Sequence, residues 1–144
     1  RLKASTATFK IIGSGTLFTK HADKGGKDSW WGVKEEREEL FSFIEEEGIG
    51  GVVLLAADRH RTDVYRLKRP NGYDFYEFVS GKITNVHTHG ANAKAEYSYN
   101  KGNFFGMLRF DFSAVDPTVA FEALDERGAV LHRVELKRSQ LERR

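Results

Sequence analysis

Residues 51–60 read Gly-Val-Val-Leu-Leu-Ala-Ala-Asp-Arg-His, an apolar run that stops abruptly in Asp-x-His. Such a run of small and branched apolar residues predicts a strand that is buried on both faces. Asp58 and His60 follow where that strand would emerge. In an extended segment, residues i and i+2 point the same way, so both side chains would face one site and could hold a metal ion. The alternative is that Asp58 caps a turn and His60 lies on the surface.

The segments before this strand predict a β-α-β unit. Residues 1–5 are typical of the last turn of a helix, and residues 8–12 are rich in β-forming side chains. A long loop over residues 13–33 leads to a helix over 33–47, where apolar residues recur at steps of three and four. If the first and second strands are parallel neighbours, the loops after them open on the same edge of the sheet. Ligands bind at that edge in open α/β sheets.

The rest of the chain predicts an antiparallel meander. A strand over residues 62–67, a turn and a returning strand over 73–79 form a hairpin. After a second long loop, further strands are expected, at residues 96–100, 104–112, 119–124 and 130–136. The predicted fold class is therefore mixed α/β (α+β), one β-α-β unit followed by a meander. Residues 1–144 form a single domain or the C-terminal part of a larger one.

Composition excludes several classes of function. The chain has 144 residues, of which 40% are hydrophobic, and its net charge is only +2. This near balance of charge does not indicate a nucleic-acid-specific module. No apolar run approaches the roughly 18 residues of a membrane span. The chain contains no cysteine, so a metal ion would have to be held by nitrogen and oxygen ligands.

The two long loops hold further candidates for substrate binding. In the first loop, Asp28 could contact a metal ion or water, and Trp30 could form a wall, although packing is an alternative role for a tryptophan here. In the second loop, Asn85 precedes the His-Thr-His stretch that begins at His87. A pair of histidines at this spacing can bind a transition metal, but it can equally lie exposed.

Several motifs in a fixed order resemble the C-terminal half of the PhoD-like (alkaline phosphatase D) proteins, which belong to the calcineurin-like metallophosphoesterases. The resemblance covers roughly residues 5 to 112. It rests on Lys-Ile-Ile-Gly-Ser-Gly at 10–15, Asp-Ser-Trp-x-Gly at 28–32, Glu-Arg-x-x-Leu at 36–40, Gly-Val-Val-Leu-Leu-x-x-Asp-Arg-His at 51–60 and Tyr-x-x-Tyr-Glu at 73–77. One departure is Ala57, where the family usually has glycine.

The resemblance implies metal-dependent phosphoester hydrolysis of the alkaline phosphatase or phosphodiesterase type. It implies a β-sandwich flanked by helices, with Asp58 and His60 as catalytic residues and metal ligands of a two-metal site. The ions would be divalent or trivalent, of the Fe, Ca, Zn or Mn class, and the substrate a phosphoester. By family analogy the location would be periplasmic or secreted.

The D-x-H, G-D and G-N-H motifs of the family do not occur before Asp58. We therefore expect a partner, the N-terminal part of the enzyme, either in the same parent chain or as a separate fragment. The alternative is a non-catalytic binding or interaction module that retains the fold without a complete metal centre.

Overall fold

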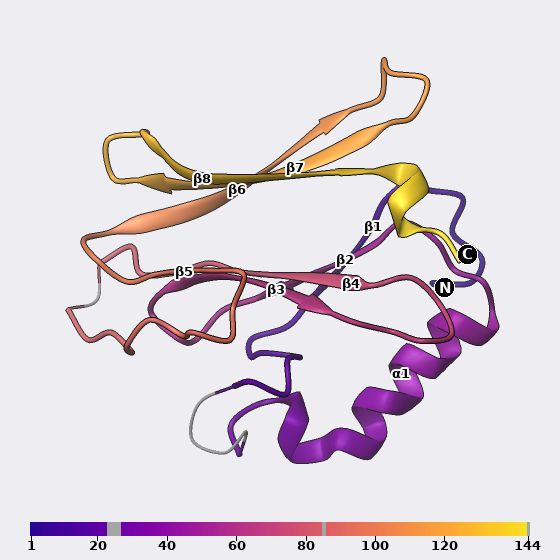
Figure 1. The fold of residues 1–144 in the computed structure, drawn as a ribbon, viewed down its shortest axis with the longest axis horizontal. Helices are drawn as coiled ribbons and strands as arrows, with labels where there is room; N and C mark the ends of the chain where they lie inside the picture. The colour runs from indigo at the N-terminus through magenta and orange to yellow at the C-terminus, as the bar shows by residue number, and fades with distance from the viewer. Residues whose placement is uncertain (23–26, 85, 144) are drawn as a thin grey trace.

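The protein folds into three layers, a small sheet, a large sheet and a helix (Figure 1). The architecture comes from a computed structural model that describes residues 1–22, 27–84 and 86–143. The two sheets pack face to face, and the helix covers the outer face of the large sheet. The predicted mixed α/β sandwich is confirmed. Residues 1–5, by contrast, form turns rather than a helix, with hydrogen bonds from the amide of Ala4 to the carbonyl of Arg1 and from the amide of Ser5 to that of Leu2.

The large sheet contains the predicted β-α-β unit and hairpin. Its strands lie in the order β1-β2-β4-β3-β5, with β1, β2 and β4 parallel to one another and β3 antiparallel to both of its neighbours. The carboxyl ends of the three parallel strands therefore lie at one edge. The bounds are β1 Lys10–Gly13, β2 Val52–Ala56, β3 Thr62–Leu67, β4 Phe75–Val79 and β5 Tyr97–Tyr99.

The helix lies against the large sheet through the apolar stripe that its periodicity predicts. A short 3-10 helix, η2 (Trp30–Val33), leads into α1 (Lys34–Glu46). Phe41 is fully buried, and its ring lies 4.8 Å from that of Phe75 on β4. Arg37 shares this face, where its guanidinium sits 4.5 Å from the centre of the Phe41 ring. The buried residues of α1 are thus two apolar side chains, Phe41 and Ile44, and two charged ones, Arg37 and Glu45.

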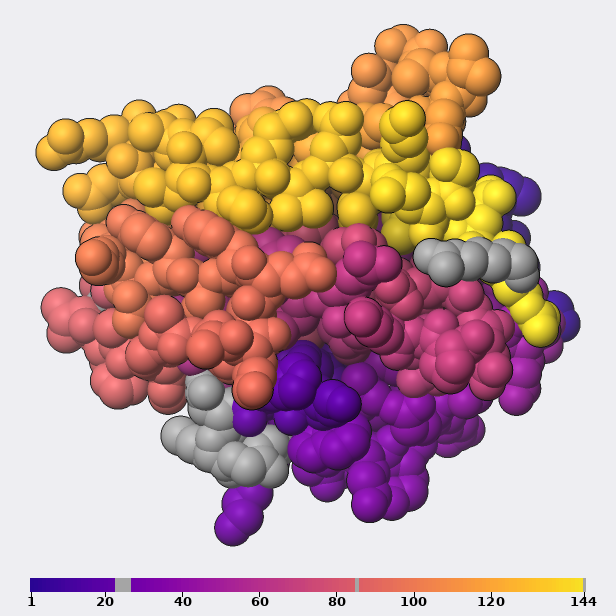
Figure 2. Space-filling model, viewed as in Figure 1, coloured from indigo at the N-terminus to yellow at the C-terminus, as the bar shows by residue number. Residues whose placement is uncertain are grey.

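The small sheet packs on the opposite face of the large sheet. Its strands are antiparallel in the order β6-β7-β8, with bounds Phe104–Asp111, Thr118–Asp125 and Val130–Lys137, followed by η3 (Arg138–Leu141). Phe121 on β7 stacks on Phe78 of β4 with ring centres 4.5 Å apart, which joins the two sheets. A side chain at Gly106 would come within 2.6 Å of Phe121, so glycine is needed for this close approach. The β6–β7 hairpin projects beyond the body of the molecule (Figure 2).

Candidate functional site

The loops that follow β1 and β2 meet at the edge where the parallel strands end. Arg59, between the two predicted ligands, is only 2% exposed and holds the loops together. Its Nη1 donates to Asp58 Oδ2 at 2.7 Å, and its Nη2 donates to the backbone carbonyl of Asp28 at 3.0 Å. The expectation that both loops open on one edge of the sheet is therefore confirmed.

The expectation of an extended Asp-x-His segment is wrong. Strand β2 ends at Ala56, and both Asp58 (φ 77°) and His60 (φ 48°) adopt the left-handed region. Residues other than glycine adopt this conformation at a cost of order 1–3 kcal/mol, and such strained residues are found most often at functional sites. Within this turn the side chain of Arg59 is buried, whereas that of Asp58 is 49% exposed.

His60 lies in a group of three histidines. Its ring centre is 5.5 Å from that of His87 and 6.2 Å from that of His89, and the latter two are 5.2 Å apart. Thr88 Oγ1 donates to the backbone carbonyl of His60 at 2.6 Å, which ties the loop after β4 to the same edge. The structure therefore brings His87 to His60. Asn85, the other candidate in this loop, lies outside the described residues.

The two predicted ligands suit a metal ion in chemistry but not in number. Asp58 and His60 supply an oxygen and a nitrogen donor, as expected for a site without thiolates. Across residues 1–22, 27–84 and 86–143, no group of three or more His, Asp or Glu side chains comes together as a metal site. The described part of the chain thus offers a partial ligand set.

The candidates in the first loop contribute to its order. Trp30 donates through Nε1 to Ser14 Oγ at 2.9 Å, and its ring stacks on Phe18 at 5.1 Å. Asp28 accepts hydrogen bonds through its backbone carbonyl from Thr16 and Arg59. These contacts place both residues in the loop beside the candidate site. Substrate contacts by their side chains stay a prediction.

Behind the site lies a buried polar network that the sequence interpretation missed. Arg61 and Asp63 are fully buried, and Arg61 Nε donates to Asp63 Oδ2 at 2.6 Å. Tyr65 donates to the same carboxylate oxygen at 3.0 Å, and Ser98 donates to Oδ1 at 2.5 Å. Arg61 Nη1 also donates to the carbonyl of Gly90 at 2.9 Å, so the network supports the loop after β4. The available signal was the Arg-x-Asp-x-Tyr alternation, which puts Arg61, just before β3, on the same side of the chain as Asp63 and Tyr65 within it.

Glu77, in the middle of β4, anchors the loop after β1 from below. Its fully buried carboxylate accepts hydrogen bonds from the backbone amides of Phe18, at 2.6 Å, and Thr19, at 2.9 Å. Burial raises the pKa of Glu77 to about 7, although both amides and the guanidinium of Arg37 favour the charged form. The available signal was the apolar sequence around it, Phe-Tyr-Glu-Phe-Val at 75–79, and its place at the end of the Tyr-x-x-Tyr-Glu motif.

Comparisons with known proteins agree with this architecture. A family model described as PhoD-like phosphatase matches residues 1–142, which confirms the resemblance that the motifs indicated. A solved structure described as PhoD matches 99% of this chain with a TM-score of 0.68 at 20% identity. A second structure, described as GAP50, the anchor in the inner membrane complex of Plasmodium, matches 91% of the chain with a TM-score of 0.54 at 11% identity. These likenesses show the fold.

The chain spans about a third of the length of these solved structures, 32% of the first and 37% of the second. No curated protein matches the sequence. Among the described residues, no helix is long and apolar enough to cross a membrane.

Proposed function

Because the chain belongs to the PhoD-like phosphatase family, we propose that it forms part of an enzyme that hydrolyses phosphoesters with bound metal ions. The observation that carries this proposal is the family match over residues 1–142, which includes the Asp-x-His segment at the end of β2. Metal ions in such a centre polarise the phosphoryl group and lower the pKa of a bound water. Asp58 and His60 are the proposed ligands, for two ions of the Fe, Ca, Zn or Mn class.

The residues around these ligands have supporting roles in this proposal. Arg59 holds the Asp58 carboxylate, and the buried network of Arg61 and Asp63 supports the loop that carries His87. The loops after β1 and β4 flank the Asp-x-His segment on two sides and would bind the phosphoester there. Asp28, Trp30, Asn85 and His87 are the substrate-binding candidates.

In this proposal a second part of the enzyme completes the ligand set, and this chain has an exposed apolar surface on which that part could pack. Within the described strands, β1 and β6 lie at the edges of their sheets with one side unpaired. Phe9, just before β1, packs on Phe110 at the end of β6 and on Phe112 just after it, with ring centres 5.7 and 6.1 Å away. Phe112 is 63% exposed and Phe110 is 40% exposed. Exposed apolar patches beside open strand edges are typical of packing surfaces.

The test uses the full-length protein that contains this chain. Hydrolysis of p-nitrophenyl phosphate and of bis(p-nitrophenyl) phosphate is measured for Asp58→Asn and His60→Gln, with bound metal quantified by elemental analysis. Glu126→Gln is the matched control, because it changes an exposed carboxylate in the turn between β7 and β8. We expect the two site variants to lose metal and at least about 100-fold in activity, while the control keeps both.

The rival proposal, a non-catalytic interaction module, predicts a different outcome. A full-length protein that binds no metal and hydrolyses neither substrate would support that module and refute the phosphoesterase. The ratio of the two activities distinguishes a monoesterase from a diesterase.

A further inference from the structure

The space between the two sheets is open along one side of the sandwich, where β1 and β6 are the edge strands. Within the described strands, each of these two pairs on one side only. A cavity of about 410 Å³ lies between the sheets beside β6. It is lined by apolar residues of β2, β4, β6 and β7 and by Ser80, just after β4. The apolar interior is therefore accessible from this side.

Side chains that point between the sheets are exposed on this side. Leu55 lies beside Phe78 in the register of β2 and β4, and Phe78 stacks on Phe121 of the small sheet. Ile11 pairs with Val53, which shares a face of β2 with Leu55, so Ile11 and Leu55 both point toward the small sheet. Ile11 is nevertheless 41% exposed, and Leu55 is only partly buried. Because inward-facing residues of a β-sandwich form its core, this part of the core lacks a cover.

The backbone of β1 has unpaired amides on the same side. The amides of Lys10 and Ser14 donate toward β2, at 2.7 and 2.9 Å. Successive amides of a strand point in opposite directions, so those of Ile11 and Gly13 point away from β2, to the edge that no described strand occupies. Such an edge can accept a further strand through main-chain hydrogen bonds.

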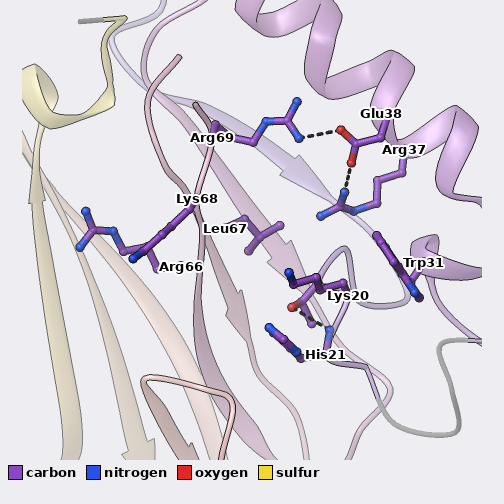
Figure 3. Close-up of a pocket in the computed structure, with 10 residues that line it drawn as sticks. Lys20, His21, Trp31, Arg37, Glu38, Arg66, Leu67, Lys68 and Arg69 are labelled. Carbon is purple, nitrogen blue, oxygen red and sulfur yellow. Dashed lines mark hydrogen bonds and ion pairs between the residues drawn. The ribbon is translucent and has the colours of Figure 1, made fainter. Parts of the chain in front are cut away.

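The helix-covered face of the large sheet differs, because its arginines are already paired. Figure 3 shows the carboxylate of Glu38 between the guanidinium groups of Arg37 and Arg69, and it forms an ion pair with each. Arg69 also forms two hydrogen bonds of 2.8 Å with Glu45. The open side between the sheets offers apolar side chains and backbone amides instead, which favours a strand over a charged ligand.

We propose that a β-strand from the N-terminal part of the enzyme pairs with the free edge of β1 and inserts apolar side chains between the two sheets. Alternate residues of this strand are apolar and cover Ile11 and Leu55. Proteins of the length of the two solved structures contain enough chain to supply such a strand, since this chain spans 32% and 37% of them. The identity of the partner rests on the proposed function, whereas the strand addition rests on the geometry of β1 and the cavity.

Amide hydrogen exchange of the full-length protein tests the pairing. The amides of Ile11 and Gly13 should exchange as slowly as those of Lys10 and Ser14, because all four would then be hydrogen-bonded within a sheet. If the edge of β1 stays open, the amides of Ile11 and Gly13 exchange at least about 100-fold faster than their neighbours. That result would overturn the proposal.

Thiol labelling tests the burial of the inward-facing side chains. Ile11→Cys and Val130→Cys are compared in the full-length protein, because both replace exposed β-branched residues on edge strands, β1 and β8. Labelled peptides are identified by mass spectrometry. The native Ile11→Cys protein should react at least about 100-fold more slowly than the native Val130→Cys protein, and the two should react at similar rates in urea. Equal rates in the native proteins would also overturn the proposal.

A second copy of the chain is the rival occupant of this edge. Protection of Ile11 that is lost on dilution, as a dimer becomes a monomer in analytical ultracentrifugation, would assign the edge to that copy and overturn the proposal. None of these readouts uses enzyme activity. A protected Ile11 in a protein without metal would support the strand addition while refuting the phosphoesterase, and an active enzyme in which Ile11→Cys reacts freely would overturn this inference alone.

Discussion

Replacing Glu77 by glutamine tests how the loop after β1 is held over the sheet. Each carboxylate oxygen accepts one backbone amide, from Phe18 and from Thr19. Glutamine keeps one acceptor oxygen and turns an NH₂ donor toward the other amide. A lost hydrogen bond to a charged group together with a buried unsatisfied N–H costs about 2–4 kcal/mol. We expect that loss in the free energy of unfolding at pH 8, measured by urea denaturation.

The pH dependence of this variant has a defined sign. In the unfolded chain Glu77 titrates near 4.5, whereas burial raises the pKa to about 7 in the folded protein. Between these values the folded state binds more protons, so the contribution of Glu77 to stability falls as the pH rises. With 1.36 kcal/mol per pKa unit, the change is at most about 3 kcal/mol. The wild type should therefore lose stability relative to Glu77→Gln between pH 5 and pH 8.

Amide hydrogen exchange localises the effect. The amides of Phe18 and Thr19 should exchange faster in Glu77→Gln, while the strand amides of β2 should change only with global stability. Glu39→Gln, at an exposed position of α1, is the control and should follow the wild type at both pH values. Unfolding curves for Glu77→Gln and the wild type that stay parallel from pH 5 to pH 8 would refute the raised pKa. Unchanged stability at pH 8 would refute the anchoring role.

Three more substitutions test other parts of the fold. Gly51→Ala would place a Cβ 2.2 Å from the carbonyl oxygen of Thr8 at a residue with φ 75°, so it should lower the free energy of unfolding by more than about 2 kcal/mol in urea denaturation. Gly13→Ala, where nothing lies within 4 Å of the new Cβ, should change it by less than about 1 kcal/mol. Equal effects of the two substitutions would contradict the steric argument. Asp63→Asn leaves the buried charge of Arg61 uncompensated and should cost about 3–5 kcal/mol by the same assay, so a neutral result would disprove that network. In Arg59→Lys the single ammonium group cannot bridge the two loops as the guanidinium does, so limited proteolysis should cut the loop before α1 faster than in the wild type. An unchanged rate of cleavage would show that the bridge is dispensable.

Local patterns were sufficient for the order and type of most elements. The apolar run at residues 51–57, the helical stripe before it and the alternation at 62–67 each depend on a few neighbouring side chains. The period of two or 3.6 residues can therefore be recognised without knowing the partner. The same run also marked the edge where Asp58 and His60 lie. The motif pattern around that pair indicated the family, and the comparison confirmed it.

The backbone conformation at Asp58 and His60 could not be predicted from these local patterns. Alternation assumed an extended segment, but Asp58 and His60 adopt left-handed conformations on either side of the buried Arg59. Burial of β3 on both faces was equally undetermined, since alternation says that Arg61, Asp63 and Tyr65 share a side of the chain but not that this side points inward.

Sequence patterns alone, then, were enough for the β-α-β unit, the hairpin, the meander and the position of the Asp-x-His segment. Packing between distant segments determined the rest. Strand β2 pairs with β4 rather than with β3, and the carboxylate of Glu77 accepts hydrogen bonds from amides almost sixty residues earlier. Such contacts depend on how whole layers pack against one another. The burial and the electrostatic environment of a residue come from its neighbours in space, which can lie anywhere in the sequence, so no periodic pattern along the chain reveals them.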